Sequence, residues 1–183
     1  MLLLIDACAR EHSRTRYLAQ RLLARFPAEE VQTVALYALG LRPLDEYGTL
    51  HRDPALARQF ARADTVVIAA PYWDLSFPSV LKVYIEHICV LDTTFRYTEE
   101  NVPVSLCRAR RLYYVTTAGG PILDPAPGYG YVETVMRTFF GIRESRCFAA
   151  ENLDLPQTDV DAALRAVCEE IDAVPMGGAD DAR

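Results

Sequence analysis

The hydrophobic positions of the chain form short continuous apolar runs that alternate with longer stretches of mixed character. Continuous runs of this kind are typical of strands that are buried on both faces of a parallel sheet. The last run is the least apolar of the set. The predicted strands cover residues 2–5, 31–37, 65–70, 112–117 and 146–150.

Between these runs, apolar residues recur at spacings of three and four, which predicts amphipathic helices. Ser13 can cap the first helix, because its hydroxyl can accept a bond from a backbone N–H of the first turn. Pro78 suits the start of the third helix, whose apolar face is too wide for one contact surface. We therefore expect that helix to be covered on two sides. The predicted helices cover residues 14–26, 56–60, 78–91, 132–140 and 160–171.

Strand and helix alternate five times, which predicts an α/β fold with a parallel sheet and helices on both faces. Right-handed crossovers leave few topologies, and the doubly wound order 2-1-3-4-5 suits five such units. Residues 38–54 and 121–130 contain the glycines and prolines of loops. We expect residues 1–174 to form a single domain and residues 175–183 to form a flexible C-terminal tail.

Composition narrows the class of protein. With 51% hydrophobic and 24% charged residues among 183, the chain is globular. Its net charge of −6 does not attract nucleic acid or anionic membranes. No apolar run approaches the roughly 18 residues of a membrane span, and the N-terminus lacks a basic leader. The five cysteines include no C-x-x-C pair, which favours reduced thiols and a cytoplasmic location. The three histidines have no metal-ligand spacing, so no metal site is predicted.

Ligands of open parallel sheets bind beyond the carboxyl ends of the strands, where the strand order reverses. The loops at that edge are residues 7–15, 71–78 and 117–122. The first loop leads into a helix N-terminus, where hydroxyl and guanidinium groups together suit a phosphate. A capped helix with a solvated basic face explains the same residues. The candidate phosphate ligands are Arg10, Ser13, Arg14 and Thr15.

The other two loops add aromatic rings and glycines. Tyr72 and Trp73 follow the third strand, and aromatic side chains beside a phosphate pocket suit a planar cofactor. Packing of the loop against its own helix explains these rings equally well. Gly119 and Gly120 would let the backbone approach a ligand closely, or simply form a turn. The nucleotide-binding fingerprints G-x-x-x-x-G-K-[ST] and G-x-G-x-x-G are missing from the sequence, which disfavours P-loop and Rossmann enzymes.

Four segments together resemble the FMN-dependent NAD(P)H azoreductases and quinone reductases. Residues 70–82, APYWDLSFPSVLK, resemble the segment of that family that contacts the flavin. Residues 94–99, TFRYTE, match a motif that follows it, and residues 116–120, TTAGG, resemble T-x-R-G-G. The first loop resembles the phosphate-binding pattern S-P-R-x-x-S-x-S. The segments occur in the order of the family.

This resemblance implies a flavodoxin-like homodimer with FMN at two interfacial sites and with the helix at 78–91 in the interface. NADH or NADPH would deliver hydride to the flavin, and a quinone or azo compound would take the electrons, with no side-chain nucleophile. The phosphate would be held by Arg10, Ser13, Arg14 and Thr15. The flavin ring would be surrounded by Pro71, Tyr72, Trp73, Asp74, Leu75, Thr117, Ala118, Gly119 and Gly120, with Tyr97 near the substrate.

Several residues depart from the family pattern. Cys8 replaces a usual Ser, and Ala118 replaces a frequent Arg. Trp73 and Leu75 replace Tyr and Phe. Asp74 replaces Asn, and a carboxylate near the flavin disfavours its anionic reduced form. We therefore hypothesise that Asp74 lowers the reduction potential of the flavin.

Two alternatives remain open from the sequence. Residues 8–15 also fit C-x5-R-[ST], the loop of the low-molecular-weight tyrosine phosphatases. A Cys8 thiolate beside Arg14 would then attack phosphorus, although Glu11 would put negative charge into that loop. The other alternative is a non-enzymatic, flavin-binding redox sensor, which an assay of NAD(P)H oxidation with a quinone would distinguish.

Overall fold

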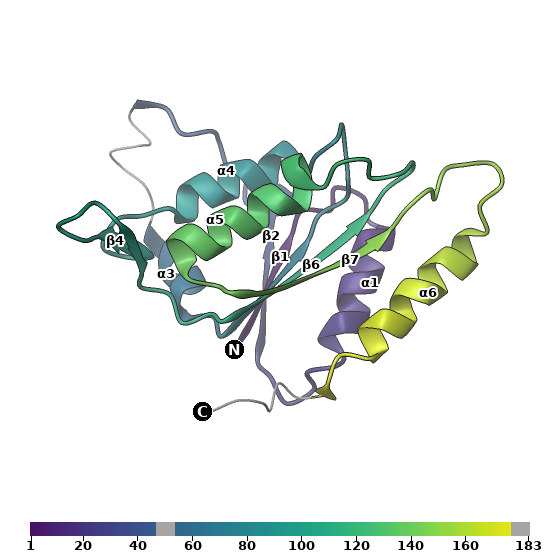
Figure 1. Cartoon of the computed structure of the whole chain (residues 1–183), viewed down its shortest axis with the longest axis horizontal. Coiled ribbons are helices and arrows are strands. Elements are labelled where there is room, and N and C mark those ends of the chain that lie inside the picture. The colour runs from purple at the N-terminus through teal and green to yellow at the C-terminus, as the bar shows by residue number, and fades with distance from the viewer. Residues whose placement is uncertain (47–53, 177–183) are drawn as a thin grey trace.

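The structure, a computed structural model, describes residues 1–46 and 54–176. Its centre is a five-stranded parallel sheet in the order β2-β1-β3-β6-β7 (Figure 1). Counted over the strands of this sheet, the order is the predicted 2-1-3-4-5. The strands are β1 (Leu2–Asp6), β2 (Val31–Ala35), β3 (Thr65–Ala69), β6 (Arg111–Thr117) and β7 (Glu144–Ala150).

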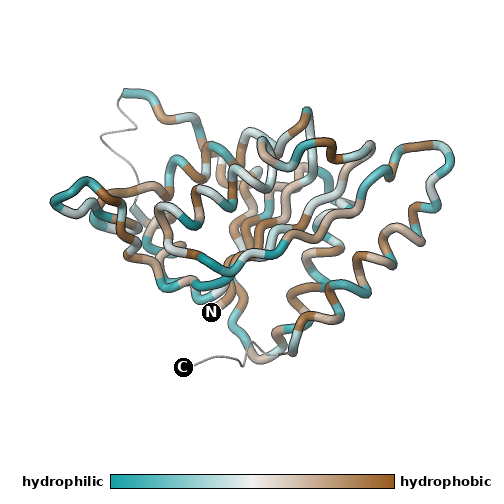
Figure 2. Tube along the Cα trace, in the orientation of Figure 1, coloured by the Kyte–Doolittle hydropathy of each residue, from teal (hydrophilic) through white to brown (hydrophobic). Residues whose placement is uncertain are grey.

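Helices cover both faces of the sheet, as predicted (Figure 1). The alternation of side chains along β1 explains how one strand serves two cores. Leu3 and Ile5 belong to the core under α3, α4 and α5, and Leu2 and Leu4 belong to the core under α1 and α6. Figure 2 shows hydrophobic residues along the central strands and hydrophilic residues along the outer loops. The helices are α1 (Arg14–Leu23), α3 (Pro54–Arg62), α4 (Ser79–Ile88), α5 (Tyr131–Phe140) and α6 (Val160–Asp172).

The second strand is shorter than the predicted range of 31–37. It ends at Ala35, which pairs with Asp6 at the end of β1, so the residues beyond it have no strand to pair with. Leu36–Ala38 form one 3₁₀ turn, η1, that buries Leu36. Of the loop predicted at 38–54, residues 47–53 lie outside the described residues.

The helix that begins after Pro78 ends at Ile88, before the predicted end at residue 91. A buried hydroxyl sets this boundary. Thr94 Oγ1 donates to the carbonyl of Ile88 at 2.7 Å and accepts from the N–H of Val90 at 3.1 Å. Because these bonds satisfy groups that a longer helix would use, the chain turns away instead.

Two short elements were not predicted. β4 (Phe95–Tyr97) and β5 (Pro103–Ser105) form an antiparallel hairpin outside the main sheet, with strands too short for a readable hydrophobic period. Within the loop predicted at 121–130, the segment η2 (Ala126–Gly130) makes a helical turn that leads into α5. The predicted flexibility of the tail concerns mostly residues 177–183, which lie outside the described residues.

Within residues 1–46 and 54–176, none of the helices has the length and hydropathy of a membrane span. In the same residues, no group of His, Cys, Asp and Glu side chains is arranged to hold a metal ion.

Candidate functional site

A cavity of about 420 Å³ lies beyond the carboxyl ends of β1, β3 and β6. Cavities of this size accommodate cofactor-sized ligands. The three loops named by the sequence meet there, and a fourth loop, after β7, adds Leu153 and Asp154. The predicted residues that line the cavity are Arg10, Ser13, Arg14, Thr15, Pro71, Tyr72, Trp73, Thr117, Ala118 and Gly119.

Asp74, Leu75, Gly120 and Tyr97 are not among the lining residues. Asp74 and Leu75 both have left-handed backbone angles, with φ of 50° and 66°. They form the tip of a two-residue turn whose flanks, Trp73 and Ser76, exchange backbone hydrogen bonds of 2.9 and 2.8 Å. Both tip residues are exposed.

The predicted substrate residue Tyr97 lies on β4 rather than in the cavity wall. Its side chain is 50% exposed, and its ring meets Phe95 edge-on at 5.5 Å between centroids. The structure of one chain therefore does not bring Tyr97 together with the phosphate candidates.

Hydrogen bonds to Thr117, at the end of β6, join the three predicted loops to one another. The Thr15 side chain is fully buried, and its hydroxyl shares a 2.7 Å hydrogen bond with that of Thr117. The carbonyl of Thr117 accepts from the N–H of Tyr72 at 2.9 Å. As predicted, Ser13 caps α1, accepting from the N–H of Arg16 at 3.3 Å. The start of α1 is thus anchored to the sheet.

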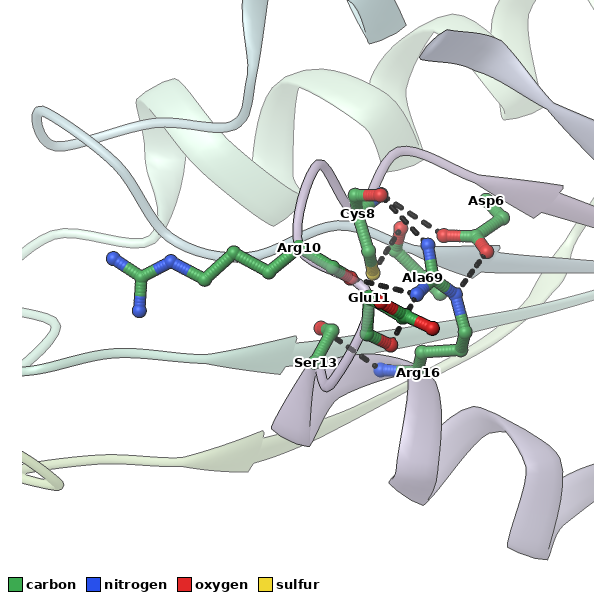
Figure 3. A network of polar contacts seen from close by, with 7 residues as sticks. All are labelled: Asp6, Cys8, Arg10, Glu11, Ser13, Arg16 and Ala69. Carbon is green, nitrogen blue, oxygen red and sulfur yellow. Dashed lines mark hydrogen bonds and ion pairs between the residues drawn. The ribbon is translucent and has the colours of Figure 1, made fainter. Parts of the chain in front are cut away.

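Arg16, which the sequence did not single out, organises the first loop (Figure 3). Its guanidinium donates to the carboxylate of Asp6 at 2.5 Å. It also donates to the carbonyls of Cys8 at 2.7 Å, Arg10 at 2.7 Å and Glu11 at 2.8 Å. Figure 3 shows the loop wrapped around this guanidinium, with the Arg10 side chain extending away from the network. Arg16 therefore fixes the conformation of the loop, although Arg16 itself does not line the cavity.

Positive groups gather at the start of α1. Arg10 and Arg14 line the cavity beside the helix N-terminus, which itself favours anions. Arg14 Nη1 forms an ion pair with Asp154 Oδ1 at 3.1 Å. This end of the cavity is chemically suited to a phosphate group.

The loop after β7 was missed by the sequence analysis, although it also follows a carboxyl strand end. The N–H groups of Leu153 and Asp154 donate to the carbonyls of Ala118 and Gly119 at 3.1 and 3.0 Å. A side chain at position 119 would collide with the Asp154 carboxylate, so glycine permits this close approach. The missed lining residues are Ala9, His12, Leu153 and Asp154.

Cys8 lacks the properties of a nucleophile. Its side chain is 4% exposed, and its Sγ lies 3.6 Å from the Ala69 carbonyl, to which the thiol can donate. Burial raises the pKa of the Cys8 thiol to about 12, so it is protonated at neutral pH. The carbonyls of Cys8, Arg10 and Glu11 bond to Arg16, whereas a phosphatase loop turns N–H groups onto its phosphate. This geometry does not support the phosphatase alternative.

Comparison with known proteins identifies relatives. The profile of a family described as having a flavodoxin-like fold matches residues 1–174. FMN-dependent NADH:quinone oxidoreductase 2 of Clostridium acetobutylicum is 38% identical over 159 residues, 79% of each chain. An FMN-dependent NADH:quinone oxidoreductase of Caldicellulosiruptor bescii is 28% identical over 188 residues, 91% of this chain and 92% of that one. An azoreductase structure from Bacillus anthracis strain Sterne has a TM-score of 0.78 at 24% identity, over 93% of this chain and 95% of that one.

The family match spans the whole sheet and every loop that lines the cavity. The identity to the clostridial protein extends over most of both chains. These findings agree with the strand order and with the four loop motifs. The chain belongs to the flavodoxin-like family that includes the FMN-dependent NADH:quinone oxidoreductases.

Proposed function

We propose that the protein is an FMN-dependent oxidoreductase that passes two electrons from NADH to a quinone or a similar small electrophilic acceptor. The observation that carries this proposal is the cavity at the sheet edge. Its lining combines the N-terminus of α1 and two arginines, Arg10 and Arg14, with the loop of Tyr72 and Trp73. Relatives over most of the chain carry the same activity in their names.

The residues present fit FMN. Arg10, Arg14 and the first turn of α1 supply cationic and N–H groups for a phosphate. Residues 71–73 and 117–119 also line the cavity and would surround the ring system. When bound, FMN would supply the chemistry of hydride acceptance from NADH and electron transfer to the acceptor.

The protein's own contribution is to bind, orient and shield. The hydrogen bond between Thr15 and Thr117 joins the start of α1 to the loop after β6, two parts of the chain that line the cavity. Trp73 lines the cavity and is 39% exposed, and an aromatic side chain there can exclude water from part of a planar ligand. We assign no side-chain acid, base or nucleophile to the reaction.

We further propose that a second copy of the chain completes the site. On α4 and the turn after it, Val83 and Val90 are apolar and half-buried in one chain, and neither is among the residues that pack against the core. A second copy packed against these residues would bury the wide apolar face that the sequence predicts for this helix. A cytoplasmic location agrees with the free thiols at Cys8, Cys107, Cys147 and Cys168.

An absorption spectrum of the purified protein with added FMN tests the proposal. We expect a flavin spectrum that stays with the protein, bleaches with NADH in the absence of oxygen, and returns when a quinone is added. Failure to bind FMN would overturn the flavoprotein assignment. Binding without catalytic oxidation of NADH would instead favour the redox-sensor alternative.

The Asp74 hypothesis can be tested on the same preparation. Asp74 is exposed at the tip of its turn, beside Trp73 of the cavity wall. Asp74→Asn removes a negative charge near the flavin, so we expect the midpoint potential of bound FMN to rise. The shift should be modest, because solvent screens an exposed carboxylate. A redox titration in which the variant shows no upward shift would contradict the hypothesis.

A further inference from the structure

The cavity contains one acidic group at the end that is suited to an anion. Its lining includes two arginines, Arg10 and Arg14, and one carboxylate, Asp154. Asp154 Oδ1 lies 3.1 Å from Arg14 Nη1. One of the two cations available to a phosphate is therefore already paired with the protein's own carboxylate.

The backbone keeps Asp154 in this position. Its N–H donates to the carbonyl of Gly119 at 3.0 Å, and the preceding N–H, of Leu153, donates to Ala118 at 3.1 Å. The missing side chain at Gly119 leaves the space that the carboxylate occupies. The backbone of Asp154 is therefore held beside the loop at 118–119 by bonds that do not involve Arg14.

The pair between Arg14 and Asp154 is open to exchange. The two side chains are 45% and 73% exposed, and exposed ion pairs contribute only about 0–1 kcal/mol. A phosphate dianion near the helix N-terminus can displace such a partner. The pair of Arg16 with Asp6 differs, because the Asp6 side chain is 7% exposed and Arg16 is bonded to three carbonyls as well.

We propose that Asp154 is a specificity-determining residue that competes with the cofactor phosphate for Arg14. By this competition it lowers the affinity of the site for FMN without affecting riboflavin, which has the same ring and ribityl chain but no phosphate. The inference rests on the proposed function, since it concerns the phosphate end of the same site. As a consequence, the site binds FMN less tightly than it would if Arg10 and Arg14 were present without Asp154.

The test is to measure dissociation constants for FMN and riboflavin, by quenching of flavin fluorescence, with the wild type and Asp154→Asn. We expect the variant to bind FMN up to about fivefold more tightly, as for the loss of one exposed charge pair, and to bind riboflavin unchanged. The gain should shrink at high ionic strength. It should also be smaller in an Arg14→Gln background.

The matched control is Asp172→Asn. Asp172 pairs with Arg21 of the same helix α1, with Arg21 Nε at 3.0 Å, and neither residue lines the cavity. This variant should change neither dissociation constant. A change of FMN affinity in Asp172→Asn as large as in Asp154→Asn would overturn the proposal, since it would reflect net charge alone.

Three further outcomes would overturn the inference and leave the proposed function standing. Weaker binding of both flavins by Asp154→Asn would make Asp154 a ligand of the shared flavin structure. If Asp154→Asn bound both flavins more tightly by the same factor, Asp154 would weaken flavin binding in general and not through the phosphate. No change for either would remove any role in affinity. Failure of the wild type to bind FMN would instead overturn the proposed function, and this inference with it.

Discussion

At the scale of single residues, the loop before α1 depends on Arg16. Lysine keeps the charge but is a point donor that cannot serve four separated acceptors. Arg16→Lys should leave loop carbonyls unpaired around the buried Asp6 carboxylate. We expect a loss of about 1–3 kcal/mol in the free energy of unfolding and about tenfold weaker FMN binding. Urea unfolding and FMN titration measure the two effects.

Arg21→Lys is the control for this prediction. Arg21 lies on the same helix and pairs only at the surface, with Asp172. Its replacement should change both quantities by less than about 0.5 kcal/mol. If Arg16→Lys behaved like this control, the network in Figure 3 would have no role in shaping the site.

The thiol of Cys8 gives a pH-dependent prediction. Its pKa is raised to about 12 by burial, so the folded protein keeps it protonated well above pH 9. Alkylation of Cys8 by iodoacetamide should therefore be very slow at pH 8, with a thiolate fraction of roughly 10⁻⁴, and fast after unfolding. Mass spectrometry of the labelled peptide measures the rate. Cys8→Ser should still bind FMN.

Fast labelling of Cys8 in the folded protein at pH 7 would contradict this prediction. Hydrolysis of a phosphate monoester that disappears in Cys8→Ser would do so more strongly. Such activity would support the phosphatase alternative. It would require a Cys8 thiol with a lowered pKa, because only the thiolate is nucleophilic.

At the scale of elements, the turn between Trp73 and Ser76 contains a strained residue. Leu75 has φ of 66°, a conformation that an L-residue without a polar side chain adopts only at a cost. Its side chain is 62% exposed, so little burial is lost on replacement. Leu75→Asn should raise the free energy of unfolding by about 0.5–1 kcal/mol, measured by urea unfolding.

Leu123→Asn is the matched control, since Leu123 is 81% exposed and has no positive φ. It should change the free energy of unfolding by less than about 0.5 kcal/mol. Equal effects of the two substitutions would show that surface polarity, and not the backbone of the turn, accounts for the change.

The boundaries of elements were the least predictable level of the fold. The end of α4 depends on Thr94, whose hydroxyl bonds to Ile88 and Val90. Helical spacing along the chain continued to residue 91, because Leu91 is apolar. Leu91 is in fact 55% exposed in one chain. Hydrophobic periodicity records which residues avoid water, but not which hydroxyl replaces a helical hydrogen bond.

At the scale of the whole molecule, the proposed dimer makes the remaining prediction. Val83→Glu places a charge on the outward, half-buried side of α4. If a second copy covers this side, burial of an unpaired carboxylate should shift the protein from dimer to monomer at micromolar concentration. Sedimentation velocity or light scattering after size exclusion measures the change.

Tyr17→Glu serves as its control. Tyr17 is 52% exposed on α1, which covers the opposite face of the sheet. This variant should remain dimeric. A monomeric wild type, or a dimeric Val83→Glu variant, would contradict the assignment of α4 to the interface.

The strand order, the two helical layers and three of the loops at the edge of the sheet could all be predicted from the amino-acid sequence. These features follow from local periodicity and from the handedness of crossovers, both of which can be read along a single chain. The motifs of residues 70–82 and 94–99 also identified the family.

The pairing of polar groups at the site, in contrast, depends on the folded path of the chain. Thr15 bonds to Thr117 across 102 positions of sequence, and Arg14 pairs with Asp154 across 140. Even the nearby contact of Arg16 with Asp6 depends on the path of the loop between them. Hydrogen bonds and ion pairs need close approach and alignment. Hydrophobic periodicity carries no record of that geometry, because it specifies which face a residue occupies and not which partner it meets there.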